Sequence, residues 1–181
     1  MKYNLQALIE TNDSYSREDF IFFWSGRKGK KVTKNCFSQW YPSEFEVDGT
    51  IYYYAEQFMM AKKALLFKDY EALSKILSAT DPKEIKQLGR EVRNFDPAVW
   101  NQHKYEIVVE GNMAKFSQNP ELTEFLKSTG NRILVEASPY DKIWGIGLNE
   151  KSPLVIDPSK WRGQNLLGFA LMEVRDKLVN C

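Results

Sequence analysis

The sequence is poor in the residues that build metal sites and disulfide frameworks. Its 181 residues include two cysteines, Cys36 and Cys181, and a single histidine, His103. There is no CxxC, HExxH or Cys/His cluster, whereas a structural zinc ion needs about four such ligands. We therefore expect no metal, no disulfide framework and no cofactor, and we expect His103 to be a packing or surface residue.

Long apolar runs and linkers are also missing. No stretch of about eighteen uninterrupted apolar residues occurs, and the N-terminal segment lacks the basic-then-apolar order of a secretory signal. We therefore expect a cytoplasmic protein with no membrane partner. The chain also lacks repeats and Pro/Gly-rich linkers, and its length suits one stable domain that spans residues 1–181.

Charge of one sign is not in excess. The 25 Lys and Arg residues nearly balance the 24 Asp and Glu residues, which leaves a net charge of +1. Proteins that hold a nucleic-acid backbone nonspecifically carry a strong basic field, so this balance disfavours nucleic acid and favours a small-molecule partner. Hydrophobic residues form 43% of the chain and aromatic residues 14%, which is typical of a folded globular protein.

The sequence does contain a few short strand signals. Residues 19–24 are mostly apolar and aromatic, and residues 43–54 carry the turn signal Asp48-Gly49 between alternating apolar positions. The second pattern is that of a β-hairpin. Residues 133–137 indicate a short buried strand.

Helix signals dominate the chain from Glu56 onward. Three helix starts are marked by an acidic or amide residue followed by proline, and residues 166–179 form an amphipathic pattern. The expected fold is mainly α within the α+β class, a single-domain helical bundle with a few short β-strands. The three starts are Asp81-Pro82, Asp96-Pro97 and Asn119-Pro120.

The first candidate site segment lies on the helix that begins near Glu56. Helical spacing places Glu56, Met60, Lys63 and Phe67 along one stripe. Seven residues span roughly 10 Å of helix axis, too far for direct contact between Glu56 and Lys63 but suitable for reaching into one ligand-sized cavity. An amphipathic helix with these two residues at its margins would give the same pattern.

The second candidate segment covers residues 134–147. An apolar strand is followed by Glu136 and Asp141, and then by Trp144 with Gly145 and Gly147 after it. Glycines allow close approach of the backbone to a ligand, and an indole can stack on a planar base. The Gly-Ile-Gly run is not GxGxxG, so no dinucleotide fold is implied. A tight turn between a strand and a helix is the alternative.

Two further places can bind phosphate. Asn165 stands just ahead of the last predicted helix, and helix N-termini attract phosphate, although asparagine is also a common N-cap. The basic run between Arg27 and Lys34 can gather phosphate or form a solvated loop.

An ordered series of motifs runs through most of the chain. They are Phe37-Ser-Gln-Trp-Tyr-Pro-Ser with Phe45 and Asp48-Gly49, Glu56-Gln with Lys63-Ala, Gly89-Arg90, Trp100, Lys115-Phe116, Thr129-Gly130, Glu136-Ala-Ser, Asp141 with Trp144-Gly-Ile-Gly, and Gly163-Gln-Asn-Leu-Leu-Gly with Leu171-Met172 and Arg175. In this order they resemble the NADAR family, also called YbiA-like, over about residues 22–175. One departure is Gln39, which stands where many members carry asparagine.

The resemblance implies a mainly helical fold and hydrolysis of N-glycosidic bonds. The bacterial substrates it implies are phosphoribosylated pyrimidine intermediates of riboflavin biosynthesis, and other members are linked to removal of ADP-ribose from guanine. The family's glutamate matches Glu56, its helix lysine Lys63, its loop aspartate Asp141, and its tryptophans Trp100 and Trp144.

The chemistry suits these residue types. Breaking a C1′–N bond develops positive charge on the sugar ring, which a carboxylate stabilises while orienting water. We assign this role to Glu56, with Asp141 as second choice. Lys63 is expected to act either as a nucleophile that forms an imine or as an anion-binding group. The residues expected to contact the substrate are Trp100, Trp144, Arg90, Gln39 and Asn165.

Three hypotheses for the function remain. The first is an N-glycosidase that cleaves a nucleobase-like pyrimidine from ribose 5-phosphate. The second is a hydrolase that removes ADP-ribose from guanine in nucleic acid. The third is a non-catalytic module that binds ADP-ribose or NAD-like ligands, against which the presence of Glu56, Lys63 and Asp141 argues.

Overall fold

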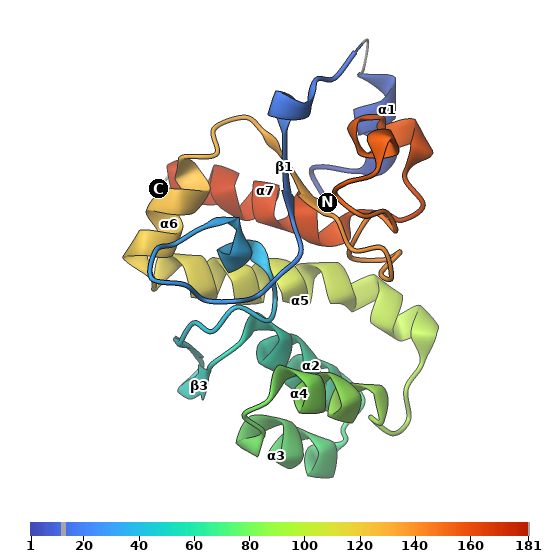
Figure 1. Ribbon diagram of the computed structural model, residues 1–181. Coiled ribbons are helices and arrows are strands. Elements are labelled where there is room, and N and C mark those ends of the chain that lie inside the picture. Colours follow the sequence, from blue (N-terminus) through green and yellow to red (C-terminus); the bar gives the residue numbers. More distant parts are fainter. Residues whose placement is uncertain (12–13, 181) are drawn as a thin grey trace.

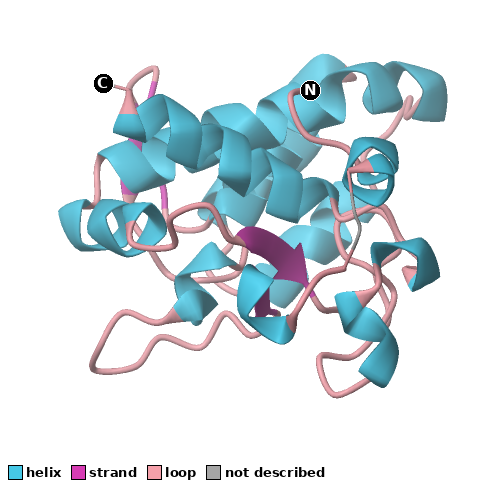
Figure 2. Cartoon of the chain, turned by 90° about the horizontal axis from the view of Figure 1, so that it is seen from above, coloured by secondary structure: helices cyan, strands magenta, loops and turns pink. Residues whose placement is uncertain are grey.

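The computed structural model describes residues 1–11 and 14–180 (Figures 1 and 2), so Cys181 lies outside the described residues. Helices dominate and the strands are short, which confirms the predicted fold class. The helices are α1 (Leu5–Glu10), α2 (Ala55–Leu66), α3 (Tyr70–Ser78), α4 (Pro82–Arg90), α5 (Pro97–Ser117), α6 (Pro120–Lys127) and α7 (Leu166–Val179), and the strands are β1 (Phe20–Phe23), β2 (Phe45–Val47), β3 (Thr50–Tyr52) and β4 (Ile133–Glu136).

The helix α5 is the centre of the molecule. It packs against α7 on one side and α2 on the other, while α3 and α4 cover α2 (Figure 1). Strand β4 packs on α7. Because both neighbours of α5 cover it, its middle turns are buried, with Val108 and Val109 almost completely inaccessible. None of the helices in the described part of the chain is long and apolar enough to cross a membrane.

Strands β1 and β4 pair in parallel although they lie far apart in the sequence. The register joins Phe20 to Ile133 and Phe23 to Glu136, so both strands end at the same edge. The pairing continues beyond the strands, because the Ala137 N–H donates to the carbonyl of Phe23 (2.8 Å). The residues that follow each strand are therefore brought to one place.

The predicted hairpin and helix starts are confirmed. Asp48 and Gly49 both have positive φ, 51° and 76°, as the tight turn between β2 and β3 requires. The side chain of Asp81 accepts the Lys83 N–H at the start of α4, and Asp96 caps α5 in the same way. Asn119 also precedes a helix, but its side chain does not cap it.

The sequence patterns gave no signal for α1 and α3. The first turn of α3 is capped by Asp69, which accepts the Ala72 N–H and is bound by the Arg93 guanidinium (2.7 Å). That ion pair joins the start of α3 to the segment after α4. Because Asp69 is followed by Tyr70 and not by proline, the start lacked the signal that marked the other helices.

Candidate functional site

Glu56 lies in the first turn of α2 and is 4% exposed. Its backbone N–H donates to the carbonyl of Gln39 (3.0 Å). The first N–H groups of a helix have no partner within the helix, and the N-cap residue Tyr54 supplies none from its side chain. The segment that ends at Gln39 therefore fixes where α2 begins and where the Glu56 carboxyl points.

Two further carboxyls come from the other half of the chain. Glu136 is the last residue of β4, and Asp141 lies in the loop that follows. The charge of Asp141 raises the pKa of both Glu56 and Glu136, and Glu56 also raises the pKa of Glu136. The three carboxyls thus lie within electrostatic range of one another.

Burial is the main cause of the altered acidity of two of these groups. It raises the pKa of Glu56 to about 7 and that of Glu136 to about 8. The positive charge of Lys86 opposes both shifts, and a hydrogen bond from Trp40 and the charge of Arg90 oppose the shift at Glu56. Both carboxyls therefore titrate near neutral pH, where acid–base catalysis is most effective.

Helix α4 carries the positive charges of this group. The Lys86 ammonium lies 5.6 Å from the centre of the Trp40 ring, and its side chain is half-buried. Arg90 is exposed at the last turn of the helix. Lys86 thus lies near the Trp40 ring and within electrostatic range of Glu56 and Glu136, while Arg90 is exposed to solvent, where it can meet a ligand.

The loop after β4 is folded around Asp141. Its Oδ1 accepts the backbone N–H groups of Ile143 (2.9 Å) and Trp144 (2.8 Å). The loop then returns to the end of β4, where a Cβ on Gly145 would lie 2.8 Å from the carbonyl oxygen of Glu136. A glycine is needed for that approach, and Trp144, which is half-buried, is positioned by the Asp141 turn.

Lys63 on α2 and Trp100 on α5 form a second group. The Lys63 Nζ donates to the carbonyl of Gly89 (2.6 Å) and lies 4.2 Å from the ring centre of Phe95 and 5.7 Å from that of Trp100. Lys63 is 9% exposed, and burial lowers its pKa. Glu56 and Lys63 are both buried, so they are not the solvated margins of an amphipathic helix.

Gln39 is buried beside Glu56. Its Nε2 donates to the Oδ1 of Asn112 on α5 (3.1 Å), whereas its Oε1 is buried and has no hydrogen-bond partner within the described residues. The residue is 8% exposed, and the hydrogen bond to Asn112 fixes its amide group, so the position of the unpaired Oε1 is fixed as well.

Asn165 occupies the N-cap position of α7, but its side chain does not cap the helix. Its Oδ1 accepts the Glu136 N–H (3.0 Å), and its Nδ2 donates to the carbonyl of Leu134 (2.9 Å). Both ends of the amide thus bind β4. The residue positions the strand that carries Glu136.

The structure brings Glu56, Asp141 and Arg90 within electrostatic range of one another, and backbone groups of Gln39 and Trp144 bond to Glu56 and Asp141. Lys63 and Trp100 lie together beside the end of α4, and Asn165 lies behind β4. Among the described residues, no group of three or more His, Cys, Asp or Glu side chains is arranged to hold a metal ion. The residues proposed from the sequence did not include four charged or aromatic neighbours, which are Trp40, Lys86, Glu136 and Lys104. Burial lowers the pKa of Lys104, and the charge of Asp141 opposes this shift.

Comparisons with known proteins identify the family of the chain. Residues 22–179 match the NADAR domain. The chain belongs to the NADAR family. An N-glycosidase of Acanthamoeba polyphaga mimivirus is 47% identical over 165 residues, which cover 88% of this chain and 96% of that protein. A riboflavin biosynthesis protein of Vibrio vulnificus is 30% identical over 78% of this chain and 35% of its own length.

The NADAR fold is also seen in a solved structure. The NMR structure of the Escherichia coli protein YbiA superposes with a TM-score of 0.72 at 24% identity, covering 95% of this chain and 92% of that one. These matches confirm the resemblance drawn from the ordered motifs. They also confirm the expected enzyme class, since relatives of this NADAR chain are named N-glycosidases.

Proposed function

We propose that the protein hydrolyses the C1′–N bond between a nucleobase-like pyrimidine and ribose 5-phosphate. The observation that carries this proposal is the buried Glu56 carboxyl, whose pKa of about 7 is set by burial and by opposing charges on Lys86 and Asp141. A carboxyl of this kind is available as an anion at neutral pH. The relative named for riboflavin biosynthesis supports a pyrimidine substrate.

In this proposal Glu56 acts on the sugar. Cleavage of the glycosidic bond develops positive charge at C1′, and an ionised carboxylate in a poorly solvated place stabilises that charge more strongly than it would in water. The same oxygen atoms accept a proton from the attacking water. Asp141 shapes the loop and adds negative charge to the region where the cation forms.

Most of the remaining candidates are assigned to binding. Arg90 is exposed at the end of α4 and its planar fork suits the 5-phosphate. Trp144 and Trp100 present half-buried rings on which the base or sugar can stack. Gln39 offers a buried carbonyl oxygen that a substrate hydroxyl or amine would satisfy. Asn165 acts indirectly, by holding β4.

Lys63 has two roles open to it. Its lowered pKa supports a neutral amine that attacks C1′ and forms an imine after ring opening. Its contacts with the Gly89 carbonyl and the Phe95 ring support a binding or positioning role, because an aromatic face favours the charged ammonium. We propose the second role, with water as the nucleophile.

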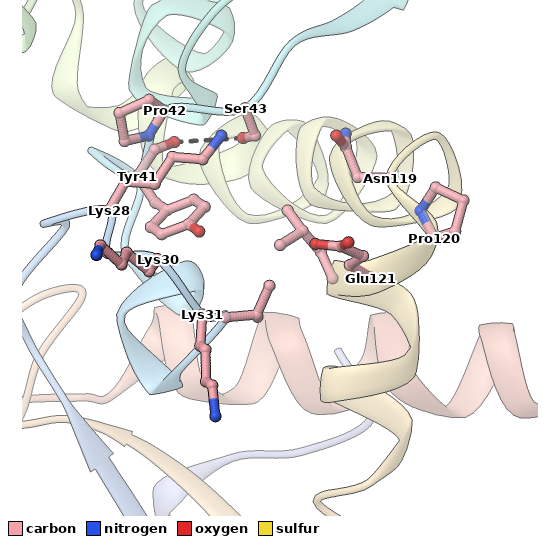
Figure 3. A pocket seen from close by; sticks show the side chains of 12 residues that line it. Lys28, Lys30, Lys31, Tyr41, Pro42, Ser43, Asn119, Pro120 and Glu121 are labelled. Carbon is pink, nitrogen blue, oxygen red and sulfur yellow. Dashed lines mark hydrogen bonds between the residues drawn. The ribbon is translucent and has the colours of Figure 1, made fainter.

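A groove favours one alternative function, the removal of ADP-ribose from guanine in nucleic acid. It has a volume of about 280 Å³ and lies between the loop that contains Lys28, Lys30 and Lys31 and the start of α6 (Figure 3). Tyr41, which directly follows Trp40, forms part of its wall. A groove lined by three lysines suits a phosphate backbone.

One experiment separates these functions. The protein is incubated in parallel with a phosphoribosylated pyrimidine and with an oligonucleotide that carries ADP-ribosylated guanine. Release of ribose 5-phosphate from the first supports our proposal. Release of ADP-ribose from the second alone, with loss of that activity in a Lys28/Lys30/Lys31→Ala variant, would favour the alternative. Binding of either compound without any product would indicate a non-catalytic module.

A further inference from the structure

Glu136 is a half-buried residue to which the proposed function gives no role. Its backbone is fixed on both sides: the N–H donates to Asn165 Oδ1 (3.0 Å) and the carbonyl accepts the Ile146 N–H (3.0 Å). Its Oε2 is buried and has no hydrogen-bond partner within the described residues. Buried polar atoms are nearly always paired, so this oxygen is placed as if to meet a group that the chain itself does not supply.

The groups around Glu136 favour its protonated form. Glu56 from α2 and Asp141 from the following loop both place negative charge near it, and Lys86 from α4 is the opposing positive charge. Burial is the largest influence, and together these effects raise the pKa to about 8. At neutral pH the side chain is therefore mostly a neutral acid with a proton to donate.

We propose that Glu136 is the general acid of the reaction and donates its proton to the leaving nitrogen. This inference rests on the proposed function. As the C1′–N bond breaks, its electron pair goes to the nitrogen, which takes the Glu136 proton. Water bonds to C1′ and its proton passes to the Glu56 carboxylate. Glu136 is left ionised and Glu56 protonated, and a proton returns from Glu56 to Glu136 through solvent before the next turnover.

Asp141 is less suited to this task. Its Oδ1 already accepts two backbone N–H groups and is committed to the turn, and within the described residues neither of its oxygens is a buried atom left without a hydrogen-bond partner. Glu56 is needed as the anion that stabilises C1′. Of the three carboxyls, Glu136 is thus the one with an uncommitted buried oxygen and an environment that retains the proton.

The test compares the wild type with Glu136→Gln, which keeps the shape and cannot donate an acidic proton. On a phosphoribosylated pyrimidine we expect kcat to fall by about 10²- to 10⁴-fold, the usual contribution of general acid catalysis. With nicotinamide mononucleotide as substrate, we expect the kcat of Glu136→Gln to stay close to that of the wild type, because the pyridinium ring leaves as a neutral base and takes no proton.

The pH profile gives an independent readout. For the wild type, kcat/KM on the pyrimidine substrate should fall as the pH rises above about 8, since the acid is then ionised, and Glu136→Gln should lose this alkaline decline. Retention of the decline in the variant would overturn the proposal, as would an equal loss on both substrates. If the wild type does not cleave nicotinamide mononucleotide, the pH profile alone decides.

These outcomes are distinct from failure of the proposed function. A wild type that cleaves no phosphoribosylated pyrimidine would reject that function, whatever Glu136 does. Folding of the variant is checked by its thermal transition, and Glu124→Gln, which changes an exposed glutamate on α6, is the matched control and should keep wild-type rates.

Discussion

Glu56 and Glu136 are carboxyl residues whose surroundings disfavour the ionised form that they adopt in water. A carboxyl is most stable as an anion in water, and its pKa rises when it is buried because the charged form loses solvation. The backbones of both residues are fixed, because the Glu56 N–H donates to the Gln39 carbonyl and the Glu136 N–H donates to the Asn165 Oδ1. The site therefore keeps two groups that titrate near neutrality at some cost in stability.

This cost gives a prediction for stability. The folded-state pKa of Glu136, about 8, lies above its ordinary value of 4.5, so the folded state binds more protons than the unfolded state between these values. The contribution of Glu136 to the free energy of unfolding then falls as the pH rises from 4.5 to about 8. We expect Glu136→Gln to be more stable than the wild type above that pH, by at least about 1 kcal/mol or about 2–4 °C in Tm.

Thermal unfolding over a range of pH measures this difference. The gain should shrink toward zero below pH 4.5, where Glu136 is neutral in both states. Glu124→Gln should follow the wild type at every pH. A Glu136→Gln variant with no advantage above its folded-state pKa would mean that the carboxyl does not carry an electrostatic penalty.

Lys63 is tested by chemical trapping. With water as the nucleophile, borohydride added during turnover should leave no substrate adduct on the protein, because the Lys63 Nζ is engaged with the Gly89 carbonyl (2.6 Å) and the Phe95 ring. Intact mass measurement shows any adduct. An adduct that appears with the wild type and is absent from Lys63→Ala would replace our assignment with the imine route.

At the scale of elements, signals of local geometry were readable in the sequence. Asp48-Gly49 specified the hairpin because both residues must adopt positive φ. Asp81 and Asp96 marked helix starts because their side chains accept backbone N–H groups and proline follows them. The start of α3 at Asp69 was missed because no proline follows its cap, and the bond from Arg93 that supports this cap comes from a later segment.

The site was readable only in part, for the same reason. Glu56, Lys63 and Asp141 stand in motifs that the sequence displays. The surroundings of Glu56 depend on contacts between distant segments, such as the parallel pairing that sets Phe23 beside Glu136 and the packing of α4 on α2. No local pattern encodes these contacts, so the electrostatic link between Glu56 and Glu136 could not be predicted.

The loop after β4 gives a prediction at this scale. Gly145→Ala places a methyl group 2.8 Å from the Glu136 carbonyl oxygen and 3.0 Å from that of Asp141, so the loop must move away from the strand. We expect a lower Tm and a loss of activity of about tenfold or more, because misplacement of about 1 Å costs about 10²-fold in some sites.

The matched control is Gly29→Ala, where the nearest atom to the added Cβ is a Lys31 carbonyl oxygen at 3.9 Å. This variant should unfold and react like the wild type. If Gly145→Ala also did so, the close approach of the loop to β4 would not matter for the site. Steady-state rates and thermal unfolding of the two variants make the comparison.

At the scale of the whole molecule, the cluster of Glu56, Glu136 and Asp141 is assembled from segments on either side of α5. Glu56 belongs to α2, which packs on one face of α5. Glu136 belongs to β4, which packs on α7, and α7 in turn covers the other face of α5 (Figure 1). The segment before α2 is also tied to α5, through Gln39 and Asn112. The integrity of the site therefore depends on the global fold and not on one motif.

The measurement that tests the account most directly is the rate of ribose 5-phosphate release from a phosphoribosylated pyrimidine, compared between the wild type and folded Glu56→Gln. We predict release by the wild type and a loss of about 10²-fold or more in the variant, because the carboxylate that stabilises charge at C1′ is gone. Equal rates for the two proteins, or no release by the wild type, would contradict an N-glycosidase site centred on Glu56.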